Sequence, residues 1–168
     1  MAIDDFELTA SDKAEFDQVF QLVLGNVDFE ITKFGKGTVQ FPIHGGIYFW
    51  LMNLNGKQIK VYIGMTENLE SRTKDYLRGF QPNSVNDFKL RFFQEFIKTT
   101  FGTAGFDLYF ADFPNCTRKQ LATVESGYRS KFDPIFDEIP LADEDTSSKL
   151  KFAYGEYLNK KFRARIAD

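Results

Sequence analysis

One hairpin decides the fold of this chain, and residues 46–64 spell it as GIYFWLMNLNGKQIKVYIG. Ile47 to Met52 and Ile59 to Ile63 are rich in β-branched and aromatic residues, which favour strands. The Asn55-Gly56 pair between these runs tolerates the positive φ angles that a tight hairpin turn requires. We therefore predict two antiparallel strands joined by a short turn.

Segments on both sides of the hairpin carry further helix and strand patterns. Before it, residues 9–25 are predicted to form one helix, because their apolar residues recur at helical spacing: Phe16, Val19, Phe20, Val23 and Leu24. After it, we predict helices over 66–78, 84–98, 117–132 and 148–162, and a strand over 106–111. Their expected N-terminal caps include Thr66, Ser84 and Thr117, the last within a Thr117–Gln120 capping box.

The order of these elements predicts an α+β (mixed α/β) domain. We expect a small three-stranded, largely antiparallel sheet flanked by helices, with helical extensions at both ends. Three regions follow: an acidic helix and extended lead-in over 1–43, a core over 44–137, and a linker with a C-terminal helix over 138–168. The last helix ends in a basic run at 160–165.

Charge and composition limit the classes of function that this chain can have. The net charge is −3, yet residues 1–31 carry −7, so the remainder of the chain carries +4 and permits a polyanionic partner. Cys116 is the single cysteine, which excludes disulfides within the chain and cysteine-rich zinc sites. No apolar run approaches the roughly 20 residues of a membrane helix, and the acidic residues 1–9 do not resemble a secretory signal. We expect no membrane association and a cytoplasmic location.

Two charged residues border faces that should be apolar. Arg72 lies between Leu69 and Tyr76 at helical spacing, and Glu125 lies likewise between Leu121 and Tyr128. Because burial of an unpaired charge is costly, each needs a partner, a metal ion or an open cleft. Periodicity leaves two readings open: the two residues pair with each other or point to water, or they belong to a functional site.

The hairpin resembles the GIY-YIG nuclease family. Its strands carry the two tripeptides that name the family, Gly46-Ile47-Tyr48 and Tyr62-Ile63-Gly64. The similarity continues through Thr66, Asn68-Leu69 and Arg72, and reaches a later helical glutamate, Glu125. It spans residues 45–137, more than half of the chain.

The resemblance implies a nuclease fold and a set of site residues. Tyr48 and Tyr62 would be the signature tyrosines, Arg72 would contact the scissile phosphate, and Glu125 would hold a divalent metal, Mg²⁺ or Mn²⁺. Tyr76 occupies a position where members carry histidine or tyrosine, and Lys60 one where lysine is frequent.

These residue types suit phosphodiester hydrolysis. Arginine offers planar, bidentate donors to phosphate oxygens, and a glutamate is a hard ligand for Mg²⁺ that retains several waters. We interpret Tyr48 as the general base, with Tyr62 and Tyr76 orienting water and phosphate, and with Lys60 biasing a neighbouring tyrosine toward its anion.

We therefore expect a metal-dependent endonuclease for double-stranded DNA, site-selective, of restriction or phage type, from a bacterial or phage-encoded gene. One departure leaves an alternative open: Asp137 stands where members often carry asparagine. The alternative is a catalytically weak module that binds DNA or another protein. The end segments are candidates for a homodimer interface, and the acidic N-terminal helix for contact with a basic protein.

Overall fold

The computed structural model describes residues 2–34, 37–77 and 85–138. The elements in chain order are η1 (Ile3–Phe6), α1 (Ala10–Val19), β1 (Gln21–Val27), β2 (Gly46–Leu54), β3 (Lys57–Thr66), α2 (Leu69–Leu77), α3 (Val85–Phe101), β4 (Gly105–Asp112), α4 (Arg118–Phe132) and α5 (Ile135–Glu138). The predicted C-terminal helix, its basic end and nearly all of the linker lie outside the described residues. In the described ranges no helix has the length and hydropathy needed to cross a bilayer.

The sheet has the strand order β1-β4-β2-β3, and every neighbouring pair is antiparallel. The predicted α+β class is confirmed, together with the three predicted strands. Asn55 and Gly56 have φ angles of 51° and 77°, the left-handed pair that a two-residue hairpin turn requires. The number of strands is corrected from three to four, because β1 joins the outer side of β4.

The predicted helix over 9–25 was wrong in its second half. The helix begins at the predicted cap, where the Thr9 hydroxyl accepts the Asp12 amide, but it ends at Val19. Gly25 and the left-handed Asn26 (φ 54°) are unfavourable in a helix, and pairing with β4 satisfies the backbone of this segment instead. The pairing is irregular, with two register shifts along β1.

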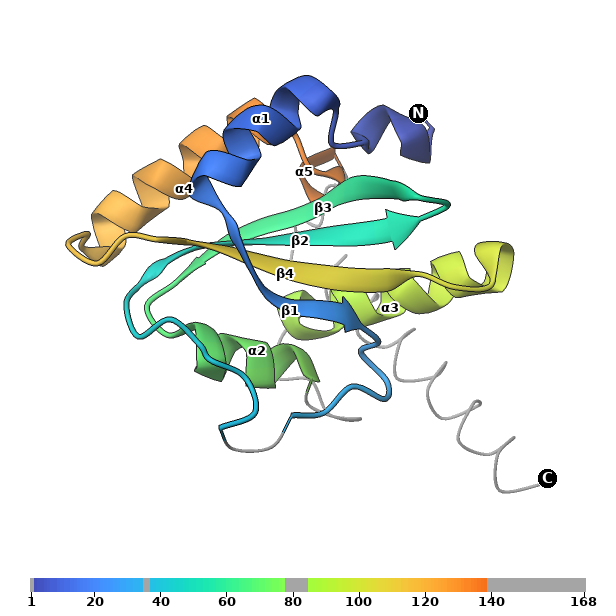
Figure 1. Cartoon of the computed structure of the whole chain (residues 1–168), viewed down its shortest axis with the longest axis horizontal. Helices are drawn as coiled ribbons and strands as arrows, with labels where there is room; N and C mark the ends of the chain where they lie inside the picture. Colours follow the sequence, from blue (N-terminus) through green and yellow to red (C-terminus); the bar gives the residue numbers. More distant parts are fainter. Residues whose placement is uncertain (1, 35–36, 78–84, 139–168) are drawn as a thin grey trace.

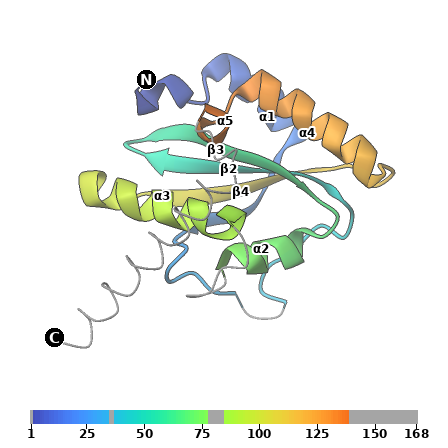
Figure 2. The ribbon, with the colours of Figure 1, turned by 180° about the vertical axis from the view of Figure 1, so that it is seen from behind.

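Helices cover both faces of the sheet, with α1 and α4 on one face and α2 and α3 on the other (Figures 1 and 2). Alternation along β2 supplies both cores, since successive strand residues point to opposite faces. Tyr48, Trp50 and Met52 belong to the cluster on the α2/α3 face, and Ile47 and Phe49 to the cluster on the α1/α4 face.

The acidic helix α1 is an integral part of the hydrophobic cluster on the α1/α4 face of the sheet. Phe16 and Phe20, the residue that follows the helix, are buried, and their ring centroids lie 5.5 Å and 5.6 Å from that of Phe49. The segment before α1 borders β3, where the Leu8 amide donates to the Gln58 carbonyl at 2.8 Å and Glu7 bridges Ile59. Helix α1 therefore lies behind the sheet as seen from Tyr48.

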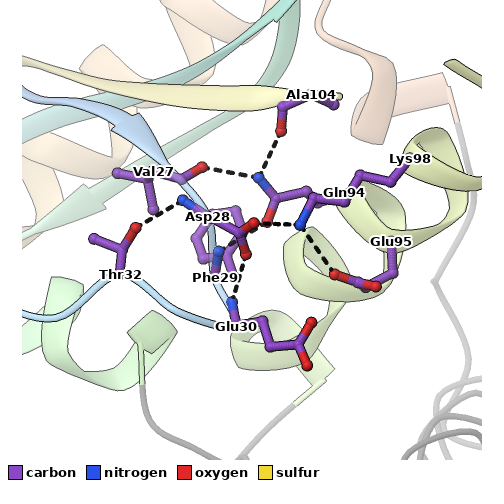
Figure 3. A network of polar contacts seen from close by, with 9 residues as sticks. All are labelled: Val27, Asp28, Phe29, Glu30, Thr32, Gln94, Glu95, Lys98 and Ala104. Atoms are coloured by element: carbon purple, nitrogen blue, oxygen red, sulfur yellow. Dashed lines mark hydrogen bonds and ion pairs between the residues drawn. The ribbon is translucent and has the colours of Figure 1, made fainter. Parts of the chain in front are cut away.

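A buried glutamine joins α3 to the segment after β1 (Figure 3). The side-chain oxygen of Gln94 accepts the Phe29 amide at 2.8 Å, and its nitrogen donates to the carbonyls of Val27 and Ala104 at 2.8 Å and 2.7 Å. Gln94 has no exposed surface, so these bonds satisfy the polar atoms of its side chain inside the core. They hold Phe29 against the rings of Trp50 and Tyr76.

Helices α2 and α4 differ in how well their starts were predicted. Thr117 caps α4 through the expected capping box with Gln120. The predicted cap Thr66 was wrong for α2, because Asn68 accepts the Ser71 amide at 2.9 Å while the Thr66 hydroxyl binds the Asn68 amide. Ser84, the predicted cap of α3, lies outside the described residues.

Candidate active site

Three side chains of the signature meet on the α2/α3 face. The hydroxyls of Tyr48 on β2 and Tyr76 on α2 lie 2.9 Å apart. The Arg72 Nε donates to the Tyr48 hydroxyl at 3.4 Å, and its Nη2 donates to the Tyr76 hydroxyl at 3.3 Å. Arg72 and Tyr76 reach the same point because they are four residues apart on one helical face. Arg72 also pairs with Asp75 at 3.6 Å.

Tyr62 on β3 adds a third tyrosine to this group. Its ring centroid lies 6.0 Å from that of Tyr48. Burial raises the pKa of Tyr62 far above its ordinary value, and the neighbouring Tyr48 and Glu125 raise it further. Burial likewise raises the pKa of Tyr76 well above 10. Tyr62 and Tyr76 therefore stay protonated, and the Tyr76 hydroxyl can donate to the oxygen of Tyr48.

Gly64 makes room for Tyr48. It lies directly opposite Tyr48 in the strand pairing, and a Cβ atom on Gly64 would stand 2.3 Å from both Cζ and the hydroxyl oxygen of Tyr48. Real Cβ atoms do not approach so closely, and Tyr48 is itself buried. The glycine of the second tripeptide is therefore required by the tyrosine of the first.

We predict that Gly64→Ala destabilises the protein by about 1–3 kcal/mol, because the added methyl group displaces a buried ring. Gly127→Ala is the matched control, since open space surrounds Gly127 on α4 and alanine favours a helix interior by about 0.5–1 kcal/mol. Urea unfolding of both variants measures the free energies. Equal stabilities would contradict the steric role of Gly64.

Glu125 on α4 lies at the edge of the sheet beside β3. Its carboxylate lies 3.5 Å from Arg129 Nη1. Burial raises the pKa of Glu125, an effect that Arg129 opposes and Asp137 reinforces. Arg129 also makes a bidentate contact with Asp137, from Nε at 2.9 Å and 3.2 Å. Asp137 therefore holds the arginine that contacts Glu125.

Lys60 is the one proposed site residue that lies apart from the others. Trp50 pairs with Tyr62 and Leu51 with Lys60, so Val61 is an additional residue that forms a bulge. The bulge reverses the alternation, and Lys60 shares the face of Leu51, where its ammonium lies 3.8 Å from Asp12 on α1. Lys60 and Tyr62, two residues apart in sequence, therefore point to opposite faces.

Lys89 on α3 is a site neighbour that the sequence reading missed. Its ammonium lies 3.8 Å from the centroid of the Tyr62 ring and 5.2 Å from that of Phe136. A sequence signal existed, because Lys89 shares helical spacing with Phe93 and Ile97 and so interrupts an apolar stripe. The same signal had singled out Arg72 and Glu125.

A hollow of about 390 Å³ lies on the side of α2 that carries Arg72. Arg72 forms part of its wall, together with Asp75 from α2 and Arg118 from the start of α4. The end of β3 and the cap of α2 complete the lining, through Met65, Thr66, Glu67 and Asn68. Arg72 thus contacts two tyrosine hydroxyls and also lines an open space.

The Glu125 carboxylate suits a cation that keeps most of its bound waters. Mg²⁺ is commonly held by one or two carboxylates, and Glu125 offers one that is 19% exposed, with Asp137 close enough to influence its charge. Among the described residues no group of three or more His, Cys, Asp or Glu side chains gathers into a metal cage. Glu125 is therefore the residue that could hold Mg²⁺ or Mn²⁺ here.

Comparisons of the chain with protein-family models, with curated proteins and with solved structures found no match.

Proposed function

We propose that this chain is a metal-dependent DNA endonuclease of the GIY-YIG type that acts in the cytoplasm. One observation carries the proposal: Tyr48, Arg72 and Tyr76, quoted from separate parts of the motif, share hydrogen bonds at one point. Gly64 is fitted to Tyr48, and Tyr62 joins from the neighbouring strand. A purely structural hairpin has no need for two hydrogen-bonded tyrosine hydroxyls and a guanidinium at one position.

In the proposed mechanism, Tyr48 takes a proton from the attacking water. The Tyr76 hydroxyl and the Arg72 Nε lie within hydrogen-bond distance of its oxygen and can donate to it. Arg72 lines the hollow, and its guanidinium would contact a phosphate bound there. A divalent ion on Glu125 would neutralise charge on the phosphate and the leaving oxygen.

One contact favours the alternative of a catalytically weak module that binds DNA or protein. Arg129 lies 3.5 Å from the Glu125 carboxylate and competes with a metal for its negative charge. Helix α1 lies on the opposite face from Tyr48, so it does not cover the tyrosines. Two of its acids pair with lysines of this chain, Asp12 with Lys60 and Glu15 with Lys131, and Asp17 is exposed toward a basic partner.

Cleavage of supercoiled plasmid tests the proposed function. We expect nicked or linear DNA with Mg²⁺ or Mn²⁺ and intact plasmid with chelator, and discrete fragments from longer duplexes. Glu125→Ala, purified in parallel, controls for contaminating nuclease. Binding in a gel shift without cleavage under any metal would favour the alternative, and absence of both cleavage and binding would refute both functions.

A further inference from the structure

A tight turn after α4 brings a second carboxylate back to this helix. Asp133 ends α4 in the left-handed conformation, with a φ angle of 47°, and its amide donates to the Arg129 carbonyl at 2.9 Å. The Asp137 amide donates to the Pro134 carbonyl at 3.0 Å as α5 begins. The chain thus folds back, and the Asp137 carboxylate lies beside the guanidinium of Arg129, eight residues earlier.

The Arg129 guanidinium is shared unequally between two acids. Its Nε lies 2.9 Å and 3.2 Å from the two carboxylate oxygens of Asp137, and its Nη2 lies 2.9 Å from Oδ1 of the same residue. The contact from Nη1 to Oε1 of Glu125 is 3.5 Å, longer than the usual limit of about 3.2 Å for an N–H···O bond. Because short, bidentate contacts are the stronger ones, Asp137 is the principal partner of Arg129.

The spacing within α4 favours a different pairing. Glu125 precedes Arg129 by four residues, the order in which a glutamate and a cation best form an ion pair along a helix. A closer pair would neutralise the carboxylate on which the proposed metal site depends. Asp137 compensates for the cation, since the two carboxylates and the guanidinium together carry a formal charge of −1, the charge of Glu125 alone.

Water screens these charges only in part. The side chains of Glu125 and Asp137 are 19% and 18% exposed, and partly buried charges are screened less than those on an open surface. Loss of the Asp137 charge would leave Arg129 attracted to Glu125 alone. A metal ion would then have to displace the guanidinium before it could use the carboxylate.

We propose that Asp137 is a positioning residue for the divalent metal: it retains the Arg129 guanidinium and so leaves the Glu125 carboxylate its negative charge for the cation. The assignment rests on the proposed function, in which Glu125 holds the metal, and adds to it the pair that sets how tightly the metal binds. Asparagine at position 137 keeps the size of the side chain and removes its charge, so Asp137→Asn is the informative substitution.

Binding of Mn²⁺ without DNA tests the assignment. This paramagnetic ion broadens the backbone NMR signals of residues near it, and broadening that Glu125→Ala abolishes belongs to this site. We expect Asp137→Asn to raise the half-saturating Mn²⁺ concentration by about 10-fold, as changes to the partners of a metal ligand do. Arg129→Gln should lower that concentration, because the competing cation is gone.

Asp133→Asn is the matched control for Asp137→Asn. It removes an exposed carboxylate from the same turn, and asparagine tolerates the left-handed conformation of this position. We expect it to bind Mn²⁺ as the wild type does. Weakening equal to that of Asp137→Asn would reduce the effect to net charge and overturn the assignment.

The double variant Arg129→Gln/Asp137→Asn separates positioning from support of the fold. Without the guanidinium there is no cation to retain, so the half-saturating Mn²⁺ concentration should return to the wild-type value. A loss that persists in the double variant, or no loss in Asp137→Asn, would overturn the assignment while wild-type cleavage still stood. A wild type that neither binds Mn²⁺ at Glu125 nor cuts DNA would remove the proposed function and this inference together.

Discussion

Tyr48→Phe is expected to lower kcat for DNA cleavage by about 10³-fold, within the range that a general base contributes. The change removes one oxygen and keeps the ring beside Gly64. The wild-type rate should rise with pH, because the reaction needs a deprotonated base, and the variant should lose that rise. DNA affinity should stay the same, since Arg72 keeps its bond to Tyr76. Single-turnover cleavage from pH 6 to 10 measures both effects.

Tyr62→Phe is the matched control for Tyr48→Phe. Burial raises the pKa of Tyr62 far above its ordinary value, so this hydroxyl stays protonated across the range and cannot supply the rise with pH. We expect a slower enzyme that keeps the wild-type pH dependence. If Tyr62→Phe flattened the profile and Tyr48→Phe did not, the base would be Tyr62.

Gln94→Leu is expected to destabilise the protein by about 3 kcal/mol or more. The substitution keeps the side chain's bulk but leaves the Phe29 amide and the Val27 and Ala104 carbonyls without this partner, at roughly 1–3 kcal/mol for each buried group that stays unsatisfied. Chemical denaturation measures the free energy of unfolding. Hydrogen exchange at the Phe29 amide should accelerate well before global unfolding.

Gln18→Leu provides the comparison for Gln94→Leu. Gln18 is exposed on α1, and surface substitutions usually change stability by less than about 0.5 kcal/mol. A Gln94→Leu variant as stable as Gln18→Leu would show that water replaces the lost bonds. A loss of stability without faster exchange at Phe29 would place the effect elsewhere on α3.

Local patterns predicted the elements whose residues carry their own signals. The hairpin followed from two runs rich in β-branched and aromatic residues and from Asn55-Gly56, and the start of α4 followed from its capping box. Strand β1 could not be predicted in this way, because Val23 and Leu24 satisfy helical spacing and become strand residues through pairing with β4. That pairing joins residues about 80 positions apart, as in the bond from the Asn26 amide to Asp107.

The candidate site was predicted in part for the same reason. Tyr48, Arg72 and Tyr76 were named from the motif, and their hydrogen bonds bring them together. The separation of Lys60 depends on the bulge at Val61, which no residue type in β3 announces. Lys89 had a signal in the periodicity of α3, but its partner Tyr62 lies on another element and needed the tertiary structure.

The irregular pairing of β1 and the bridge beside β3 have a consequence for how copies of this chain meet. Outer strands with free backbone groups are templates for aggregation, because a second chain can add to them as a further strand. Two register shifts and the left-handed Asn26 disrupt that template along β1. At β3, residues 7 and 8 already occupy part of the outer edge. Self-association of this protein should therefore use side-chain surfaces and leave the sheet at four strands.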